Sequence, residues 1–145
     1  MHAIVYVSEY TKSDESINQD LNDITKIAKE TNPTLDITGL LFYHNRKFLQ
    51  IIEGEKESLE KLMVSIEKDP RHRNIERLID EKAIRRSYKD WNMDSFNLSD
   101  HESLDLDKLK IINKIYKESW LLESEILIDF YKLMLQQEDL TKYNI

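Results

Sequence analysis

The chain's two prolines each follow a helical hydrophobic pattern, and their placement limits the fold more than any other feature of the sequence. The first pattern begins near Ser13, a candidate N-cap, and ends at Asn32 before Pro33; the second ends at Asp69 before Pro70. Proline lacks a backbone N–H and disfavours helical backbone at the preceding residue, so a helix ends there. The apolar residues of the two patterns recur at helical spacing: Ile17, Leu21, Ile24, Ile27 and Ala28, then Leu59, Leu62, Met63 and Ile66. We therefore expect two helices, each with one apolar face.

Five runs rich in β-branched and aromatic residues surround these helices and are typical of strands. They cover residues 3–8, 37–43, 48–53, 77–84 and 91–96. The polar residues 44–47 between the second and third runs predict a hairpin, and Gly54 permits the turn into the second helix. The resulting order predicts an α+β fold, a ferredoxin-like βαββαβ sheet with an extra strand and both helices on one face.

The chain has 145 residues, the length of one ordinary domain. Residues 97–145 carry two further helical patterns: Leu106, Leu109, Ile112, Ile115 and Tyr116, then Ile126, Leu127, Phe130, Leu133 and Met134. This segment is too short for a second domain and too apolar to stay in solvent. We therefore expect a domain at residues 1–96 and a C-terminal helical extension at 97–145, packed on the other face of the sheet or on a neighbouring subunit.

Composition excludes several classes of site. The absence of cysteine excludes a disulfide scaffold, a thiol nucleophile and any cysteine-ligated metal. Two glycines are too few for a glycine-rich phosphate loop. A net charge of −7 without a basic stripe makes nucleic acid a poor partner. Because neither a signal peptide nor an apolar run of about 18 residues is visible, we expect a cytoplasmic protein without a membrane span.

Enzyme chemistry is the weaker class of function for this sequence. The four histidines are scattered, without the pairing or carboxylate neighbours that a metal site needs. No serine or carboxylate pair stands at a spacing that indicates catalysis. Arg71 with Asn32 resembles the anion-binding pair of an acylphosphatase-like hydrolase, which remains an alternative.

Three polar residues stand where the patterns favour apolar ones. Tyr6 lies in the middle of the first strand, on the face that it shares with Ile4. Gln50 lies between Phe48 and Ile52, which share its face. Asn32 ends the first helix. Because a buried amide without partners costs about 1–3 kcal/mol, a polar group between sheet and helices is expected to satisfy Gln50.

Each of these residues also has a purely structural explanation. A buried tyrosine commonly bonds a carbonyl, an asparagine before proline commonly caps a helix, and a strand glutamine can face water at a sheet edge. On that reading the chain is a light-insensitive ferredoxin-like module that binds a small ligand or forms a dimer.

Six motifs taken in order resemble one family over about residues 1–96. They are Tyr6-x-Ser8, then Asn32, then Ile37-Thr38-Gly39-Leu40-Leu41, then Phe48-x-Gln50-x-x-Glu53-Gly54, then Asp69-x-Arg71-His72, and finally Trp91-x-Met93. In this series they resemble the BLUF family of blue-light sensors that use FAD, and the helical extension resembles that of the short, stand-alone members. The resemblance implies a photoreceptor without enzymatic turnover.

The resemblance also implies roles for particular residues. FAD would bind non-covalently, with its ring between the two helices of one sheet face. Tyr6 would give an electron and then a proton to the photoexcited flavin, and Gln50 would be the hydrogen-bond switch. Trp91 and Met93 would sense the change and relay it to other protein contacts. The implied cofactor-binding residues are Ser8, Ile24, Asn32, Gln50, Ile66, Asp69, Arg71 and His72.

The resemblance also raises the question of partners. We expect signalling through changed protein–protein contacts, in a homo-oligomer and toward a downstream protein that the sequence does not identify. Two positions depart from the family pattern or vary within it: Asp94 follows Met93 where a small residue is common, and Thr31 precedes Asn32 where relatives carry varied polar or aromatic residues. We therefore expect the local turn after the sensing strand to differ.

Overall fold

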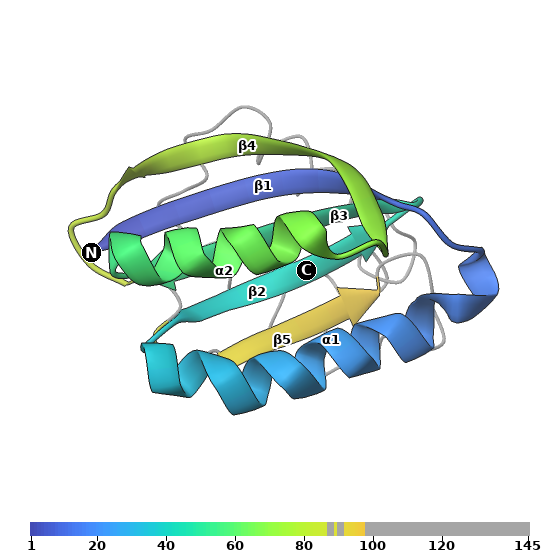
Figure 1. Cartoon of the computed structure of the whole chain (residues 1–145), viewed down its shortest axis with the longest axis horizontal. Coiled ribbons are helices and arrows are strands. Elements are labelled where there is room, and N and C mark those ends of the chain that lie inside the picture. Colours follow the sequence, from blue (N-terminus) through green and yellow to red (C-terminus); the bar gives the residue numbers. More distant parts are fainter. Residues whose placement is uncertain (87–88, 90–91, 98–145) are drawn as a thin grey trace, which may run out of the picture. The chain divides into compact units, whose positions relative to one another are not determined.

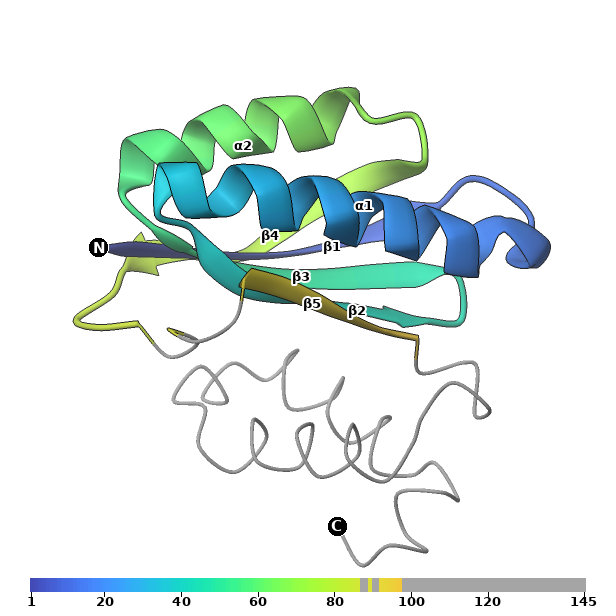
Figure 2. The same cartoon turned by 90° about the horizontal axis from the view of Figure 1, so that it is seen from below.

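The computed structural model describes residues 1–86, 89 and 92–97, so Trp91 and nearly all of the predicted C-terminal extension lie outside the described residues. The described residues form a five-stranded sheet with the order β4-β1-β3-β2-β5 (Figure 1). Its strands are β1 (His2–Tyr10), β2 (Thr38–His44), β3 (Lys47–Gly54), β4 (His72–Lys82) and β5 (Asn92–Asn97). The helices α1 (Ile17–Thr31) and α2 (Lys56–Lys68) both cover one face, as Figure 2 shows.

This arrangement confirms the predicted ferredoxin-like βαββαβ order with an extra strand. β1 pairs antiparallel with both β3 and β4, and β2 pairs antiparallel with β3. The extra strand β5 lies beside β2 and runs in the same direction (Figure 1). The side chains facing the helices form the core with the helices' apolar residues, among them Ile4, Tyr6, Tyr43, Phe48, Ile52, Leu21, Leu59 and Met63. None of the helices in the described part of the chain is long and apolar enough to cross a membrane.

The ends of the first helix differ from the prediction. A 3₁₀ turn at Asp14–Ser16 precedes α1, and the side chain of Ser13 makes no capping hydrogen bond. Instead, the carbonyl of Ser13 accepts a bond from the amide of Ser16, at 3.0 Å. At the other end the chain tightens into a second 3₁₀ helix, Asn32–Leu35. Pro33 fits there because the first turn of a helix needs no amide hydrogen from it.

The predicted hairpin between β2 and β3 is tighter than the four polar residues indicate. His44 pairs with Lys47, so the loop is only Asn45 and Arg46. Both have positive φ angles, 47° and 66°, as a type I′ turn requires. The guanidinium of Arg46 compensates for the strained backbone by bonding Asp14 at 2.8 Å and the Lys12 carbonyl at 2.6 Å.

Gly39 stands where the neighbouring strand leaves no room for a side chain. A Cβ atom at this position would lie 1.9 Å from the carbonyl oxygen of Ile51, a distance that no side chain tolerates. The same Cβ would lie 3.0 Å from the methyl carbon of Met93. Glycine therefore lets β2 and β3 approach and leaves room for the Met93 side chain.

Candidate functional site

A cavity of about 450 Å³ lies between α1, α2 and the sheet. Its walls come from four strands and two helices, as well as the segment that joins α2 to β4. The lining residues are Tyr6, Ile24, Ile27, Ala28, Thr31, Asn32, Leu41, Phe48, Gln50, Leu62, Ser65, Ile66, Asp69, Arg71 and His72. Eight of the nine residues predicted for the cofactor and the photochemistry come from separate parts of the sequence, yet they line this cavity together: Tyr6, Ile24, Asn32, Gln50, Ile66, Asp69, Arg71 and His72.

Tyr6 and Gln50 face each other across neighbouring strands. They are direct partners in the register of β1 and β3, and both are buried. The Tyr6 hydroxyl donates a hydrogen bond to Oε1 of Gln50. Burial raises the pKa of Tyr6 well above its ordinary value, and the negative charge of Asp69 raises it further. Tyr6 therefore keeps its proton and acts as a donor at neutral pH.

Met93 continues this chain of hydrogen bonds. Nε2 of Gln50 donates to the Met93 sulfur at 3.0 Å, and Met93 is fully buried. Because Oε1 accepts from Tyr6, the amide is oriented with its nitrogen toward β5. Met93 thus contacts the predicted switch residue directly. The backbone at Met93 has a φ angle of 73°, which lies in the left-handed region.

Asn32 contributes a buried amide that lacks a protein partner. Its side chain is 1% exposed, and within the described residues its Nδ2 is the one buried side-chain nitrogen or oxygen without a hydrogen bond. Its backbone carbonyl accepts from the amide of Ile37, which leaves the side chain on the cavity wall. An amide N–H group in this position suits a carbonyl acceptor of a flat heterocycle, such as an isoalloxazine ring. The residues present therefore fit a flavin.

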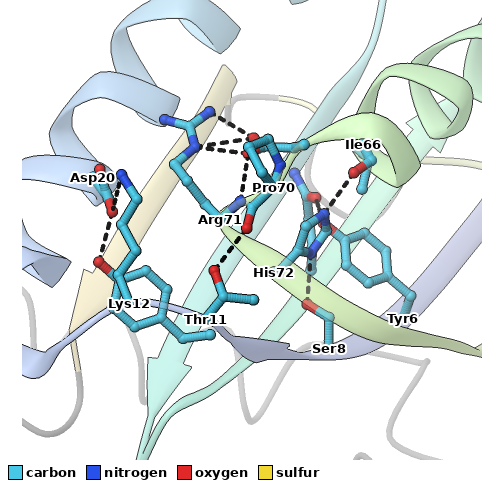
Figure 3. A network of polar contacts seen from close by, with 12 residues as sticks. Tyr6, Ser8, Thr11, Lys12, Asp20, Ile66, Pro70, Arg71 and His72 are labelled. Carbon is cyan, nitrogen blue, oxygen red and sulfur yellow. Dashed lines mark hydrogen bonds and ion pairs between the residues drawn. The ribbon is translucent and has the colours of Figure 1, made fainter.

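Asp69 and Arg71 form the charged end of the cavity. Nε and Nη2 of Arg71 bond the Asp69 carboxylate at 2.9 and 2.6 Å, and the Arg71 amide also donates to it (Figure 3). Partial burial raises the pKa of Asp69, but the hydrogen bonds and charge of Arg71 outweigh it and lower that pKa. The same pair raises the pKa of Arg71. Both groups are therefore charged at neutral pH, and part of the guanidinium is already used by a protein partner.

Ser8 reaches the cavity only through His72. The Ser8 hydroxyl lies 2.8 Å from Nδ1 of His72, while Nε2 of His72 lies 2.5 Å from the carbonyl of Ile66 (Figure 3). A carbonyl only accepts, so Nε2 carries the hydrogen, and in the neutral ring Nδ1 accepts from Ser8. Ser8 is thus placed behind the lining residue rather than on the wall.

Sequence reasoning assigned several lining residues to the core instead. The sequence patterns place Ile27, Ala28 and Leu62 on the apolar faces of their helices, but the cavity uses these side chains. Ile27 is 57% exposed, although it belongs to the apolar pattern of α1. The apolar faces of these helices are wider than the core between helix and sheet requires. This excess of apolar residues is the sequence signal that could have indicated a ligand.

Comparison with known proteins identifies the family. The model of the family described as sensors of blue light using FAD matches residues 1–94. The chain belongs to the BLUF family. This confirms the resemblance inferred from the six motifs, and the family binds FAD.

Similar proteins include both curated relatives and solved structures. The chain is 32% identical over 93 residues to photoactivated adenylate cyclase subunit beta of Euglena gracilis, covering 64% of this chain and 11% of that protein. It is 31% identical over 103 residues to the blue light- and temperature-regulated antirepressor BluF of Escherichia coli, covering 71% of this chain and 25% of that protein. The BlsA structure in its photo-activated state is 28% identical, with a TM-score of 0.67 and coverage of 95% and 97%. The chain therefore matches only a tenth to a quarter of these two curated relatives.

Proposed function

We propose that this BLUF chain senses blue light through a hydrogen-bond switch formed by Tyr6 and Gln50, which Met93 reads. One observation carries the proposal. A continuous run of hydrogen bonds passes from Tyr6 through Gln50 to Met93, along a cavity whose wall also holds the unpaired amide of Asn32. An apolar cavity whose wall holds both hydrogen-bonded side chains and an unsatisfied donor indicates a bound ligand that completes the hydrogen-bond network.

Different lining residues would bind different parts of FAD. When bound, the flavin supplies blue-light absorption and an excited state that accepts an electron. Ile24 of α1 and Ile66 of α2 lie on the cavity walls, where they can pack against the two faces of the ring. Asn32 donates to a ring carbonyl. Asp69, Arg71 and His72 serve the ribityl–phosphate side, and the absence of cysteine leaves no thiol for a covalent link.

The amide of Gln50 can reverse without a change in volume, because its oxygen and nitrogen have nearly the same shape. In the structure the oxygen accepts from Tyr6 and the nitrogen donates to Met93. After reversal the nitrogen donates to the Tyr6 hydroxyl, and the oxygen faces the Met93 sulfur. A thioether sulfur has no hydrogen to donate, so the bond to Met93 is lost while the bond to Tyr6 persists. Met93 therefore distinguishes the two orientations.

We also propose that the output is a changed protein–protein contact rather than turnover. The relay pairs Met93 with Trp91, which lies outside the described residues. The flavin domain comprises residues 1–96, and residues 97–145 form the helical extension that packs on it in a homo-oligomer. The support is the sequence, which has two amphipathic patterns in 97–145 and no catalytic spacing.

Absorption spectroscopy of the purified protein tests the switch. We expect oxidised FAD bound non-covalently, and a modest red shift under blue light that reverses in the dark. Tyr6→Phe and Gln50→Leu should each retain flavin and lose the normal red shift, since each removes one partner of the central hydrogen bond. Gln19→Leu, at an exposed position of α1, is the matched control and should keep the full response. A colourless protein that refuses added FAD, or a full red shift in Gln50→Leu, would contradict the proposal.

A further inference from the structure

Met93 is held in a backbone conformation that residues with a Cβ atom disfavour. Its φ angle of 73° lies in the left-handed region, and the side chain is fully buried. The Met93 sulfur accepts from Gln50, and its methyl carbon fills the space beside Gly39. Such a conformation persists only when neighbouring contacts hold it, so the residues around Met93 must fix the start of β5.

Two contacts from α1 hold the residues that follow Met93. Nζ of Lys29 lies 2.7 Å from Oδ1 of Asp94, and the Thr25 hydroxyl donates to the Ser95 hydroxyl at 2.9 Å. Thr25 and Lys29 are four residues apart and therefore lie on one side of α1. We call these two contacts the α1–β5 latch. Asp94, which departs from the family pattern, is thus one of its members.

α1 connects this latch to the cavity. The same helix contributes Ile24 and Ala28 to the cavity lining, and Asn32 follows its last residue. One side of α1 therefore faces the ligand site, while a neighbouring side holds β5. β5 has a strained backbone at Met93, and its next two residues are bonded to α1. The position of β5 therefore depends on the Met93 backbone and on α1.

We propose that Lys29 and Thr25 are positioning residues that hold Met93 against Gln50 through Asp94 and Ser95. This inference rests on the proposed function, because holding Met93 affects the photocycle only if Met93 responds to the orientation of the Gln50 amide. The latch preorganises the contact that must form again after light, and it speeds the thermal return of the spectrum in the dark. The Lys29–Asp94 pair is half exposed, so salt screens it and its effect is modest.

Recovery kinetics of the flavin-loaded protein test this role. Lys29→Met should slow the dark recovery by about two- to fivefold, the range that one exposed ion pair supports. Lys29→Asp combined with Asp94→Lys restores opposite charges and should bring the rate back toward the original value. Raising ionic strength from about 0.05 to about 0.5 M should slow the unmodified protein and leave Lys29→Met unchanged. Lys61→Met, which removes the exposed Lys61–Glu57 pair on α2, is the control and should not alter the rate.

Amide hydrogen exchange of the flavin-free protein provides a second measurement that needs no photocycle. Lys29→Met and Thr25→Val should each increase exchange in residues 92–97 by about two- to fivefold, whereas Lys61→Met should not. Unchanged or faster recovery in Lys29→Met, or unchanged exchange in 92–97, would overturn the latch. If the unmodified protein shows no red shift at all, the proposed function fails, and exchange alone decides whether the latch holds β5.

Discussion

At Asn32 the requirements of folding and of ligand binding differ. The side-chain amide is buried, and its nitrogen lacks a partner among the described residues. An unsatisfied buried donor costs about 1–3 kcal/mol, so the flavin-free fold is less stable than it would be with an apolar side chain of similar size there. In the proposed complex a carbonyl of the ring would remove this cost. The unpaired amide thus supports the proposed role of Asn32 in binding, because it does not stabilise the flavin-free fold.

Replacing Asn32 by alanine separates these two effects. We expect weaker FAD binding by about 10- to 100-fold, because the ring carbonyl loses its donor, a bond of about 1–3 kcal/mol. The urea midpoint of the flavin-free protein should stay unchanged or rise, since the unpaired amide is gone. Titration with FAD and urea denaturation followed by circular dichroism measure the two quantities.

The matched control for this variant is Asn22→Ala, at an exposed position of α1. It should leave FAD binding unchanged. A variant at position 32 that binds FAD normally, or that destabilises the flavin-free protein by several kcal/mol, would contradict the assigned role.

At the scale of the elements, the segment between α2 and β4, residues 69–71, makes several polar contacts of the site. Asp69 ends α2 and binds Arg71 through its carboxylate. The end of β1 supports the same junction, because the Thr11 hydroxyl donates to the Pro70 carbonyl at 2.6 Å and its amide to the Arg71 carbonyl at 3.0 Å. Figure 3 shows this network from β1 to the start of β4. The charged end of the cavity is thus fixed by local geometry before any ligand binds.

The pH dependence of stability should reveal the Asp69–Arg71 pair. The pKa of Asp69 is lower in the folded state than its ordinary value of 3.8, so the pair stabilises the fold above that pH. This contribution is lost as the pH falls below 3.8 and through the lowered pKa. Asp69→Asn should therefore lower the free energy of unfolding by about 1 kcal/mol at pH 7 and by little at about pH 2.

Urea denaturation of the flavin-free protein at the two pH values measures this difference. Glu57→Gln, an exposed carboxylate on α2, serves as the control and should show a small effect at both. An Asp69→Asn cost that is the same at both pH values would mean that the ion pair does not stabilise the fold.

In the whole molecule, the two faces of the sheet carry different kinds of residue. The face toward the helices holds the polar chain of Tyr6 and Gln50 among apolar residues. The central alternate positions of β1 and β3 are apolar: Ala3, Val5 and Val7, then Leu49 and Ile51, with Glu9, Lys47 and Glu53 toward the strand ends. Phe42 and Phe96 stack with ring centroids 5.4 Å apart. The residues of the proposed switch thus lie on one face of the sheet, and the centre of the other face is apolar.

Ending the chain at Ser99 tests the proposed division of labour. The cavity proposed to hold the flavin is lined by residues between Tyr6 and His72, so the shortened protein should keep its reversible red shift. Loss of the two amphipathic patterns should expose apolar surface, change the oligomeric state and abolish light-dependent partner binding. Light scattering measures the mass, and absorption spectroscopy measures the red shift. A shortened chain with the native mass and partner response would place the output surface within residues 1–96.

Local signals in the sequence were enough to determine the element order and to single out the photochemical pair. Helical spacing ended by Pro33 and Pro70 predicts α1 and α2, because apolar periodicity and proline act on neighbouring residues. The period of two in a strand places Tyr6 and Gln50 on buried faces, and their polarity distinguishes them there. The motif series then identified the family.

Tertiary structure alone decided how these residues meet. The register of β1 against β3 makes Tyr6 and Gln50 partners, and pairing between strands distant in the chain sets it. The position of Ser8 behind His72, the unpaired amide of Asn32 and the α1–β5 latch likewise depend on contacts between residues far apart in sequence. The left-handed backbone at Met93 contradicts its local preference, so no local pattern could predict it. Such features are stable only when the surrounding elements are already packed, and the sequence therefore encodes them jointly rather than residue by residue.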